Sequence, residues 1–530
     1  MIDAAATQIV DFQTRGQDIP QLLAHWAHHR PDHPALVWDP RSDAVRSWTY
    51  GELLSDVRRL AAGLSEHEIR RGDAVLIHSD NSPELILVWL ACATLGAIAV
   101  ATNTKSVAGE IAYFASKARC VAAITHPPFA AMVAEAAPAM RWIAVTDTVG
   151  GAPAGDLRPG FLRFAELFAD AEQWRGRPIE PMLPAGIMFT SGTTSRPKAV
   201  VHTHANAVWA ARTGPRNIDL GPDDRYLIYL PFFHTNAQGW SFFAVLGVGA
   251  TAVLMPKWST GRFWECVTRH GVTHISLLPF VMPVLEGPER PAVHTLRVGV
   301  FGLVSRDLGR RLGISVYAAF GMTETVTHCI VGKPVEHLPD FSMGHVAPGY
   351  EIAVVDKNSG RLCAEGDPGE LWLRGTRGIQ LFLEYLDNPE ANDAAFEDGW
   401  FKTGDMVRMG EGGNVFYQER DKDLLKVGGE NVSAVEVERL ISTVPGIARV
   451  AVVGKSHEFL GQVVAAFVIA APDAPDSTTL ASTVIATCAE RLASFKVPRA
   501  VYVVGEFPTG MLDKLLKNNL RELADAQPPV

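Results

Sequence analysis

Several features that place a chain in a common protein class are missing from this 530-residue sequence. Its six cysteines include no Cys-x-x-Cys pair, so the sequence indicates neither a zinc ribbon nor a redox motif, and we expect a reducing, cytoplasmic environment. The N-terminus lacks the basic and apolar regions of a secretory signal. Acidic residues outnumber basic ones by 58 to 48, and the resulting net charge of -10 argues against a nucleic-acid partner.

A membrane span is also missing from the sequence. The longest apolar run, from Leu85 to Ala101, is preceded by Glu84 and divided by Gly96. It is too short and too interrupted to cross a bilayer. We therefore expect a buried helix over residues 82–95 and a short strand over residues 97–101.

The stretch that carries most chemical information is FTSGTTSRPK, residues 189–198, which follows a strand-like apolar run. Gly192 lets the backbone turn and present its N–H groups, the hydroxyl groups can donate to phosphate oxygens, and Lys198 can neutralise negative charge. A Walker A loop is disfavoured because Pro197 stands at its second glycine position and Ala199 follows the lysine. The stretch predicts a different phosphate-binding loop, with a solvated Ser/Thr-rich turn as the alternative.

Helices alternate with short apolar strands through most of the chain. Strands are expected at residues 74–78, 97–101, 120–125 and 142–146, and this rhythm predicts a largely parallel sheet covered by helices. Two further helices are expected at residues 164–173 and 202–212, and His202 and His204 in the second are given no role. After Gly349, strands separated by turns predict an antiparallel or barrel-like subdomain. The expected fold class is α/β, with a large N-terminal domain over 1–421 and a small α+β domain over 422–530.

Five motifs follow one another in a defined order. After the phosphate loop come LPFFHTNAQG (230–239), AFGMTET (319–325), GWFKTGD (399–405), RDKDLLKVGGEN (420–431) and a tail around Lys514. Together they closely resemble the adenylate-forming (AMP-binding) superfamily of acyl-CoA synthetases, adenylation domains and luciferases. The run after Pro231 and the tail look most similar to the crotonobetaine/carnitine-CoA ligase-like branch.

The resemblance implies an acyl-CoA synthetase, an enzyme that joins a carboxylic acid to CoA in two steps. The acid first attacks the α-phosphate of ATP, which gives acyl-AMP and pyrophosphate, and CoA then displaces AMP. The first step brings anions together, so catalysis depends on positioning and on charge neutralisation. ATP, Mg²⁺ and CoA are the cofactors and second substrate that the resemblance implies.

The resemblance also assigns nucleotide-binding residues. The phosphates would be held by Thr190, Ser191, Gly192, Thr193, Thr194 and Lys198. Phe320 would stack on adenine where the family usually has tyrosine. Thr323 would bond the α-phosphate and Glu324 would hold Mg²⁺. Asp405 and Arg420 would bind the ribose.

The C-terminal motifs imply a mobile domain. Lys514 would bridge the acyl carboxylate and the α-phosphate, although Asp513 stands where the family usually has glycine, and Lys517 is the alternative candidate. The small domain would rotate between the two half-reactions. Four more residues match family positions: Lys422 at the hinge, Gly429 beside the pantetheine arm, and Lys426 and Asn431 at phosphate or substrate contacts.

The candidate acid pocket begins in the first motif after the phosphate loop, the one that contains His234. This histidine matches the family position beside the acyl carboxylate, and a packed core residue is the alternative. The pocket residues expected are His234, Asn236, Gln238, Gly239, Trp240 and Phe301. No Asp or Glu lies between Asp224 and Glu265, so an α-ammonium group has no partner and amino acids are disfavoured. Aliphatic, aryl and carnitine-like acids stay open.

Two other functions remain as alternatives. A stand-alone ligase could load a carrier protein in place of CoA. A non-catalytic nucleotide-binding module is disfavoured because Lys198, Glu324, Asp405 and Lys514 occur together. We expect no nucleic-acid partner and no membrane span, and a homodimer is one of the oligomeric states left open.

Overall fold

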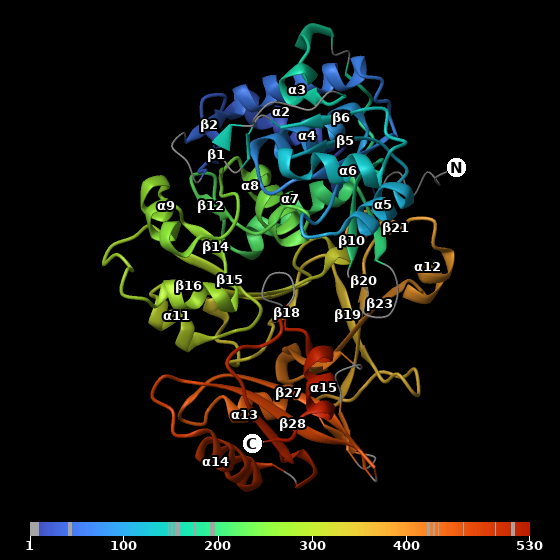
Figure 1. The fold of residues 1–530 in the computed structure, drawn as a ribbon. Coiled ribbons are helices and arrows are strands. Elements are labelled where there is room, and N and C mark those ends of the chain that lie inside the picture. The colour runs from blue at the N-terminus through green and yellow to red at the C-terminus, as the bar shows by residue number, and fades with distance from the viewer. Residues whose placement is uncertain are drawn as a thin grey trace. The chain divides into compact units, whose positions relative to one another are not determined.

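The chain divides into two compact units in the computed structural model, and Figure 1 labels many of their helices and strands. The first unit contains Met1–Glu351 and Leu373–Phe401, and the second contains Ile352–Trp372 and Lys402–Val530. The structure describes residues 10–40, 45–146, 148–149, 152–153, 160–173, 176–190, 197–420, 425–427, 430–432, 434–458, 460–492, 494–509 and 515–529. The predicted domain boundary near Lys422 falls outside these ranges and stays a prediction.

The first unit contains an eight-stranded sheet in the order β21-β11-β10-β4-β3-β5-β6-β9. Its central pairs, from β10 through β4 and β3 to β5 and β6, are parallel, whereas β11 pairs antiparallel with both β10 and β21. The strands are β3 (Ala74–His78), β4 (Ile98–Ala101), β5 (Cys120–Thr125), β6 (Ile143–Val145), β9 (Leu162–Arg163), β10 (Pro184–Thr190), β11 (Lys198–Thr203) and β21 (Glu384–Tyr385). The predicted parallel, helix-covered sheet is confirmed.

A nine-stranded sheet completes the first unit, in the order β18-β17-β16-β15-β14-β12-β13-β1-β2. Its middle strands are parallel, and β2, β17 and β18 are antiparallel additions at the two edges. The strands are β1 (Pro34–Trp38), β2 (Arg46–Thr49), β12 (Arg225–Ile228), β13 (Thr251–Leu254), β14 (His274–Ser276), β15 (Val298–Phe301), β16 (Ser315–Phe320), β17 (Ile330–Gly332) and β18 (His345–Val346). The GMTE motif therefore begins at the carboxyl end of β16, where parallel sheets bind ligands.

Eleven α-helices are assigned among the described residues of this unit. They are α2 (Ile19–His29), α3 (Tyr50–Glu66), α4 (Pro83–Leu95), α5 (Ala108–Lys117), α6 (Ala130–Ala136), α7 (His204–Asn217), α8 (Phe243–Val248), α9 (Phe263–His270), α10 (Met282–Leu285), α11 (Arg306–Leu312) and α12 (Pro389–Ala395). As expected, α4 is buried throughout; Ser82 caps its start, and Gly96 ends it with φ +83°. Within the described parts of the chain, no helix has the length and apolar character that a membrane span requires.

Two predicted helices differ from the observed structure. Residues 164–173 form two separate 3₁₀ turns, Phe164–Leu167 and Ala171–Gln173, because the backbone N–H of Ala169 donates to the Arg59 carbonyl of α3 at 3.1 Å. The helix predicted at 202–212 starts later, at His204, because His202 lies inside strand β11. Thr203 caps α7 by accepting from the Asn206 N–H at 3.1 Å, and the helix runs to Asn217.

The second unit contains most of one five-stranded sheet and all of another. The first consists of β19 (Glu351–Val355), β20 (Pro368–Arg374), β22 (Phe396–Glu397), β23 (Trp400–Met409) and β24 (Val415–Arg420), with antiparallel pairing of β23 to β22 and β24. The second has the order β26-β25-β28-β27, with β29 beside β28. Its strands are β25 (Leu425–Val427), β26 (Glu430–Val432), β27 (Ile447–His457), β28 (Gly461–Ala470) and β29 (Ala500–Val503).

Alternate residues of β28 build two apolar cores in this unit. Val464, Ala466 and Val468 pack with buried residues of α13 (Ala434–Ile441) and α14 (Ser477–Arg491), whereas Ala465 and Phe467 pack with α15 (Lys517–Ala526). This alternation places helices on both faces of the sheet because successive side chains of a strand point to opposite sides. The predicted small α+β C-terminal domain is confirmed in its fold class.

Candidate functional site

The ends of the phosphate loop are fixed by the β10–β11 ladder. Thr190 and Lys198 face each other as the terminal pair of these antiparallel strands. The Tyr113 hydroxyl donates to the Pro197 carbonyl oxygen at 2.9 Å, which anchors the returning chain. Residues 191–196, which include Ser191, Gly192, Thr193 and Thr194, lie outside the described part of the chain. Their assigned phosphate contacts therefore stay predictions.

Lys198 and Glu324 are joined through a third residue, and we call the three the Lys198–Tyr385–Glu324 cluster. The Lys198 Nζ atom lies 4.4 Å from the centre of the Tyr385 ring. The Tyr385 hydroxyl donates to Oε1 of Glu324 at 2.9 Å. Burial and the adjacent Glu324 charge raise the pKa of Tyr385 well above its ordinary value, so the phenol stays protonated. Two motifs far apart in sequence therefore meet in one place.

The backbone holds this cluster together. Strand β21 lies beside β11, with Tyr385 opposite Val200, and the Phe382 N–H donates to the Glu324 carbonyl oxygen at 2.8 Å. Glu324 itself is only 5% exposed. Sequence reasoning missed Tyr385 because β21 is a two-residue strand with no motif of its own.

The turn that carries Glu324 is held by residues from other elements. Thr323 begins this 3₁₀ turn, and the His202 Nε2 atom lies 2.8 Å from the Thr323 carbonyl oxygen. Burial lowers the pKa of His202 to about 4, so the neutral imidazole is the donor. Val326 ends the turn with φ +63°, a strained value for a β-branched residue. His202, for which we predicted no role, therefore positions the backbone of the GMTE motif.

The candidate acid pocket lies against the same turn. Asn236–Phe242 form a π-helix, a rare element that often marks functional sites. A Cβ atom at Gly239 would lie 2.2 Å from the Val326 carbonyl oxygen, so only glycine permits this approach. The Thr235 hydroxyl donates to that same oxygen at 2.8 Å. The π-helix therefore packs directly against the turn that follows Glu324.

The remaining pocket residues occupy defined places around this helix. His234 precedes it, half-buried, with its ring 4.7 Å from that of Phe233. Gln238 is buried, and Phe301 ends β15 beside β16. Oδ1 of Asn236 accepts from the Ser276 hydroxyl at 2.7 Å. Trp240 packs edge-on against His328, with ring centres 4.6 Å apart.

The donor set at Glu324 fits a magnesium ion. Mg²⁺ prefers hard oxygen ligands and is usually bound by one or two carboxylates together with substrate phosphates and water. Glu324 supplies one buried carboxylate, Thr323 is its neighbour in the turn, and Lys198 belongs to the same cluster. One protein carboxylate beside a cation suits a metal that arrives with a polyphosphate.

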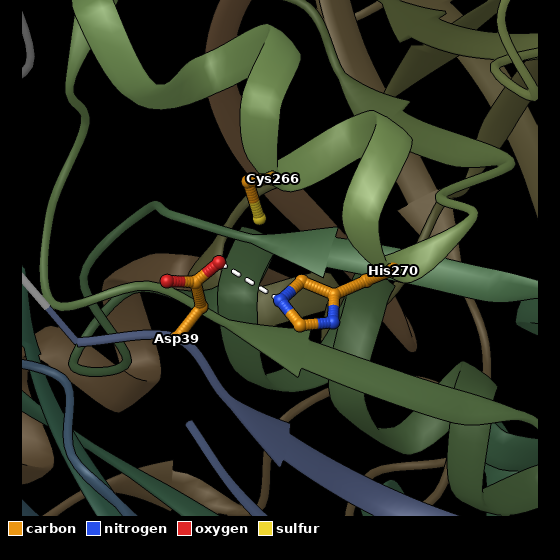
Figure 2. A group of neighbouring side chains, drawn as sticks. All are labelled: Asp39, Cys266 and His270. Atoms are coloured by element: carbon orange, nitrogen blue, oxygen red, sulfur yellow. Dashed lines mark hydrogen bonds and ion pairs between the residues drawn. The ribbon is translucent and has the colours of Figure 1, made fainter. Parts of the chain in front are cut away.

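A second group of potential metal ligands lies elsewhere in the first unit, and Figure 2 shows it as Asp39, Cys266 and His270. His270 Nε2 lies 2.8 Å from Oδ2 of Asp39, and the Arg269 guanidinium lies 3.8 Å from the same oxygen. Arg262 forms an ion pair with Oδ1 of Asp39. Burial raises the pKa of the Cys266 thiol, which disfavours the thiolate that binds metals. Two guanidinium groups already neutralise Asp39, so this group is a structural ion-pair cluster.

Burial also keeps other histidines of the first unit neutral. The buried side chains with a pKa lowered to about 4 are those of His78, His126, His202 and His274. In each case, removal of the imidazole from water disfavours its charged form. These residues make the stability of the unit dependent on pH.

The second unit holds the other predicted nucleotide residues. Asp405 is buried in β23 and stands opposite Arg420 of β24 in the antiparallel ladder. Lys426 stands opposite Asn431 in the β25–β26 hairpin. Lys422, Gly429 and Lys514 lie outside the described part of the chain.

Lys517, the alternative to Lys514, has a structural partner. It is the first residue of α15, and its Nζ atom lies 3.0 Å from Oε1 of Glu438. Both side chains are mostly buried, at 16% and 20% exposure. Removal of this lysine would leave a buried carboxylate uncompensated, which favours a structural role.

Comparison with known proteins agrees with this arrangement. The sequence pattern of the AMP-binding enzyme family matches residues 23–386, and that of the AMP-binding enzyme C-terminal domain matches residues 436–510. Among curated relatives, the crotonobetaine/carnitine–CoA ligase of Salmonella typhimurium (strain LT2) is 31% identical over 525 residues, which cover 96% of this chain and 99% of the relative.

Two solved structures extend the comparison. O-succinylbenzoate CoA synthetase from Bacillus subtilis is 27% identical with a TM-score of 0.80 in its complex with the acyl-adenylate intermediate, covering 96% of this chain and 99% of the other. The same enzyme has been solved with ATP and a magnesium ion. ATP-bound MatB from Rhodopseudomonas palustris is 25% identical with a TM-score of 0.84, covering 96% and 99% of the two chains.

Proposed function

Because this chain belongs to the AMP-binding enzyme family, we propose that it is an ATP-dependent acid–CoA ligase that forms an acyl-AMP intermediate. A carboxylic acid and ATP give acyl-AMP and pyrophosphate, and CoA then gives acyl-CoA and AMP. The observation that supports this best is the Lys198–Tyr385–Glu324 cluster, which brings the end of the phosphate loop to the GMTE carboxylate. The cytoplasm is the proposed compartment, since none of the six cysteines, all of which lie in the described part of the chain, forms a disulfide.

Charge neutralisation is the main task of the first unit in this proposal. Lys198 offsets the charge that develops on pyrophosphate, and Glu324 with Thr323 holds the magnesium ion that ATP brings. That ion would supply Lewis-acid stabilisation of the phosphates. Tyr385 is a positioning residue, because its hydroxyl fixes the rotamer of Glu324 and its ring supports Lys198. Phe320, at the end of β16, offers a half-buried aromatic face for adenine.

The acid in this proposal carries no α-ammonium group. His234 and the π-helix residues Asn236, Gln238, Gly239 and Trp240 line its site together with Phe301. Asn236 already uses its carbonyl oxygen to bind Ser276, and no acidic residue lies between Asp224 and Glu265. Crotonobetaine and carnitine are the acids named for the curated relatives, and aliphatic and aryl acids belong to the same test.

The second unit supplies the remaining roles. We propose that Asp405 and Arg420, which face each other across β23 and β24, bind the ribose. Gly429 lies beside the pantetheine arm in the thiol-transfer step, and Lys426 and Asn431 contact the phosphate or substrate in one conformation. A hinge at Lys422 divides a 1–421 domain from a mobile 422–530 domain. Lys514 acts in adenylation only.

A panel of acids tests the proposed reaction. The purified protein is given ATP, Mg²⁺ and one acid at a time, and pyrophosphate release is measured with and without CoA. We expect acid-dependent release, with acyl-CoA formed when CoA is added. If a phosphopantetheinylated carrier protein is acylated in preference to CoA, the acceptor is a carrier. No acid-dependent release across aliphatic, aryl and betaine acids would contradict the proposal.

The two lysines near the C-terminus provide a matched pair for the adenylation step. We expect Lys514→Ala to abolish acid-dependent ATP–pyrophosphate exchange while sparing thioester formation from supplied acyl-AMP. Lys517→Ala should keep both steps and lower stability, because its partner Glu438 loses a half-buried ion pair. Equal loss of both steps in Lys514→Ala would refute separate roles for the two conformations.

A further inference from the structure

A cavity of about 860 Å³ lies along α11 in the first unit, apart from the residues discussed so far. Its floor is apolar and includes Val304, Val316 and Leu338. Its rim carries Arg306, Arg310, Lys333, His337 and Asp340. The volume is within the range of small-molecule sites, about 300–1,000 Å³.

The cavity and the Glu324 turn lie toward different parts of the same strands. Arg297 and Ser315, at the amino ends of β15 and β16, line the cavity. Phe320 and the GMTE turn lie at the carboxyl end of β16. Strand β16 covers five residue steps from Ser315 to Phe320, a length of roughly 17 Å. None of the described residues that line the cavity has been placed in the nucleotide or acid site, so the cavity is a separate place on the molecule.

The rim carries an excess of positive charge in a chain whose net charge is -10. Asp340 is the one acidic residue among the cavity-lining residues described, and it is engaged by Arg306 at 3.5 Å and by the Arg306 N–H at 3.0 Å. Among the described residues, the Arg310 side chain has one ionic contact, a long one of 3.5 Å to Asp307, and both of these side chains are mostly exposed. Such an exposed pair contributes little, so the Arg310 guanidinium can be shared with a ligand.

Lys333 completes the basic rim from the opposite wall. It follows β17, whose Gly332 pairs with Ala318 of β16, and it is half-buried. Any Cβ atom at Gly332 would lie 2.9 Å from Val304 and 3.0 Å from Leu338, so the floor beside Lys333 is tightly packed apolar surface. Cations on two walls and an apolar floor between them suit a ligand with both phosphate and a flat apolar part.

We propose that this cavity binds an organic phosphate with a planar apolar group, of the chemistry of a purine nucleotide. Arg310 and Lys333 hold the phosphate from the two walls, and the base covers Val304, Val316 and Leu338. The nucleotide end of CoA and a free nucleotide share this chemistry. The inference goes beyond the proposed ligase reaction and does not depend on it.

Calorimetric titration with adenosine 3′,5′-bisphosphate tests the proposal on the full chain. No other nucleotide is added, because AMP shares the proposed chemistry and would fill this cavity as well; the sites are counted from the binding stoichiometry, with the ATP site as the first. We expect binding at one additional site, weakened about tenfold or more in the double variant Arg310→Glu/Lys333→Glu and unchanged in Arg58→Glu, an exposed charge reversal on α3. No additional binding, or equal affinity in the double variant and the control, overturns the proposal.

Two further readouts identify the source of the phosphate and separate this proposal from the ligase proposal. If the site serves CoA, the double variant raises the KM for CoA. The KM values for CoA and dephospho-CoA then lie closer together than in the wild-type enzyme. If it serves a free nucleotide, bisphosphate binding is lost while the KM for CoA is unchanged. If the ligase proposal is wrong, no variant shows acid-dependent pyrophosphate release. If the cavity proposal is wrong, pyrophosphate release is intact and no second nucleotide site is found.

Discussion

Replacement of Tyr385 by phenylalanine isolates one hydrogen bond of the Lys198–Tyr385–Glu324 cluster. The substitution removes the hydroxyl that donates to Glu324 at 2.9 Å and keeps the ring 4.4 Å from the Lys198 ammonium. Glu324 is 5% exposed, so water does not readily replace the lost donor. We expect Glu324 to lose its fixed rotamer and with it the geometry for magnesium and phosphate.

The magnitude follows from the charge on the acceptor. A hydrogen bond to a charged group is worth about 1.5–3 kcal/mol. If about 2 kcal/mol of it is realised in the transition state, kcat/KM for ATP–pyrophosphate exchange falls about 30-fold. Tyr385→Ala also removes the ring beside Lys198. The loss of this cation–π contact should raise the activation free energy by a further amount of about 0.5–2 kcal/mol and lower kcat/KM accordingly.

Tyr50→Phe is the matched control for this experiment. The Tyr50 hydroxyl is buried in the same way and donates to the neutral Ala250 carbonyl at 2.7 Å, outside the cluster. Its loss should lower the free energy of unfolding by about 1 kcal/mol and leave kcat/KM unchanged. Wild-type kcat/KM in Tyr385→Phe, at saturating acid and varied Mg²⁺, would refute the positioning role of this tyrosine.

Three other predictions concern stability. A histidine in the unfolded chain takes up a proton near pH 6.5, whereas the buried His202 does so only near pH 4. The free energy of unfolding should therefore fall by roughly 2 kcal/mol between pH 7 and pH 5 for each of the four buried histidines with this pKa. A free energy of unfolding that stays constant over this pH range in urea titrations would contradict the prediction. Asp39→Ala should lower the free energy of unfolding by about 3 kcal/mol, whereas Asp223→Ala, which breaks an exposed ion pair, should lower it by less than about 1 kcal/mol. Zinc and chelators should leave the free energy of unfolding of the wild-type protein unchanged. Stabilisation by zinc would instead support a metal site at Asp39. Gly239→Ala should lower the free energy of unfolding by about 2 kcal/mol and reduce pyrophosphate release. Gly109→Ala, which has open space around it, should change neither quantity. Equal melting temperatures for the two variants would refute the close approach of Gly239 to the Val326 carbonyl oxygen.

The motifs could be predicted because each depends on residues that are neighbours in the chain. A glycine among hydroxyl residues before Lys198, or a carboxylate at the end of a buried strand, expresses its chemistry in local order. The buried helix at residues 82–95 was equally local, since Ser82 and Gly96 mark its two ends. The prediction of a helix at residues 164–173 was wrong because a hydrogen bond to α3, which lies far away in the sequence, interrupts it.

The sequence by itself determined the fold class, the family resemblance and the identity of Lys198, Glu324 and Asp405 as candidates. Only the tertiary structure decided which distant residues support them: Tyr385 reaches Glu324 across 61 positions because β21 pairs with β11, and His202 reaches Thr323 across 121. Pairing of strands brings such residues together, and a one-dimensional pattern does not record which strands pair. The same reason explains why the basic cavity along α11 had no signal in the sequence, since its walls come from separate elements.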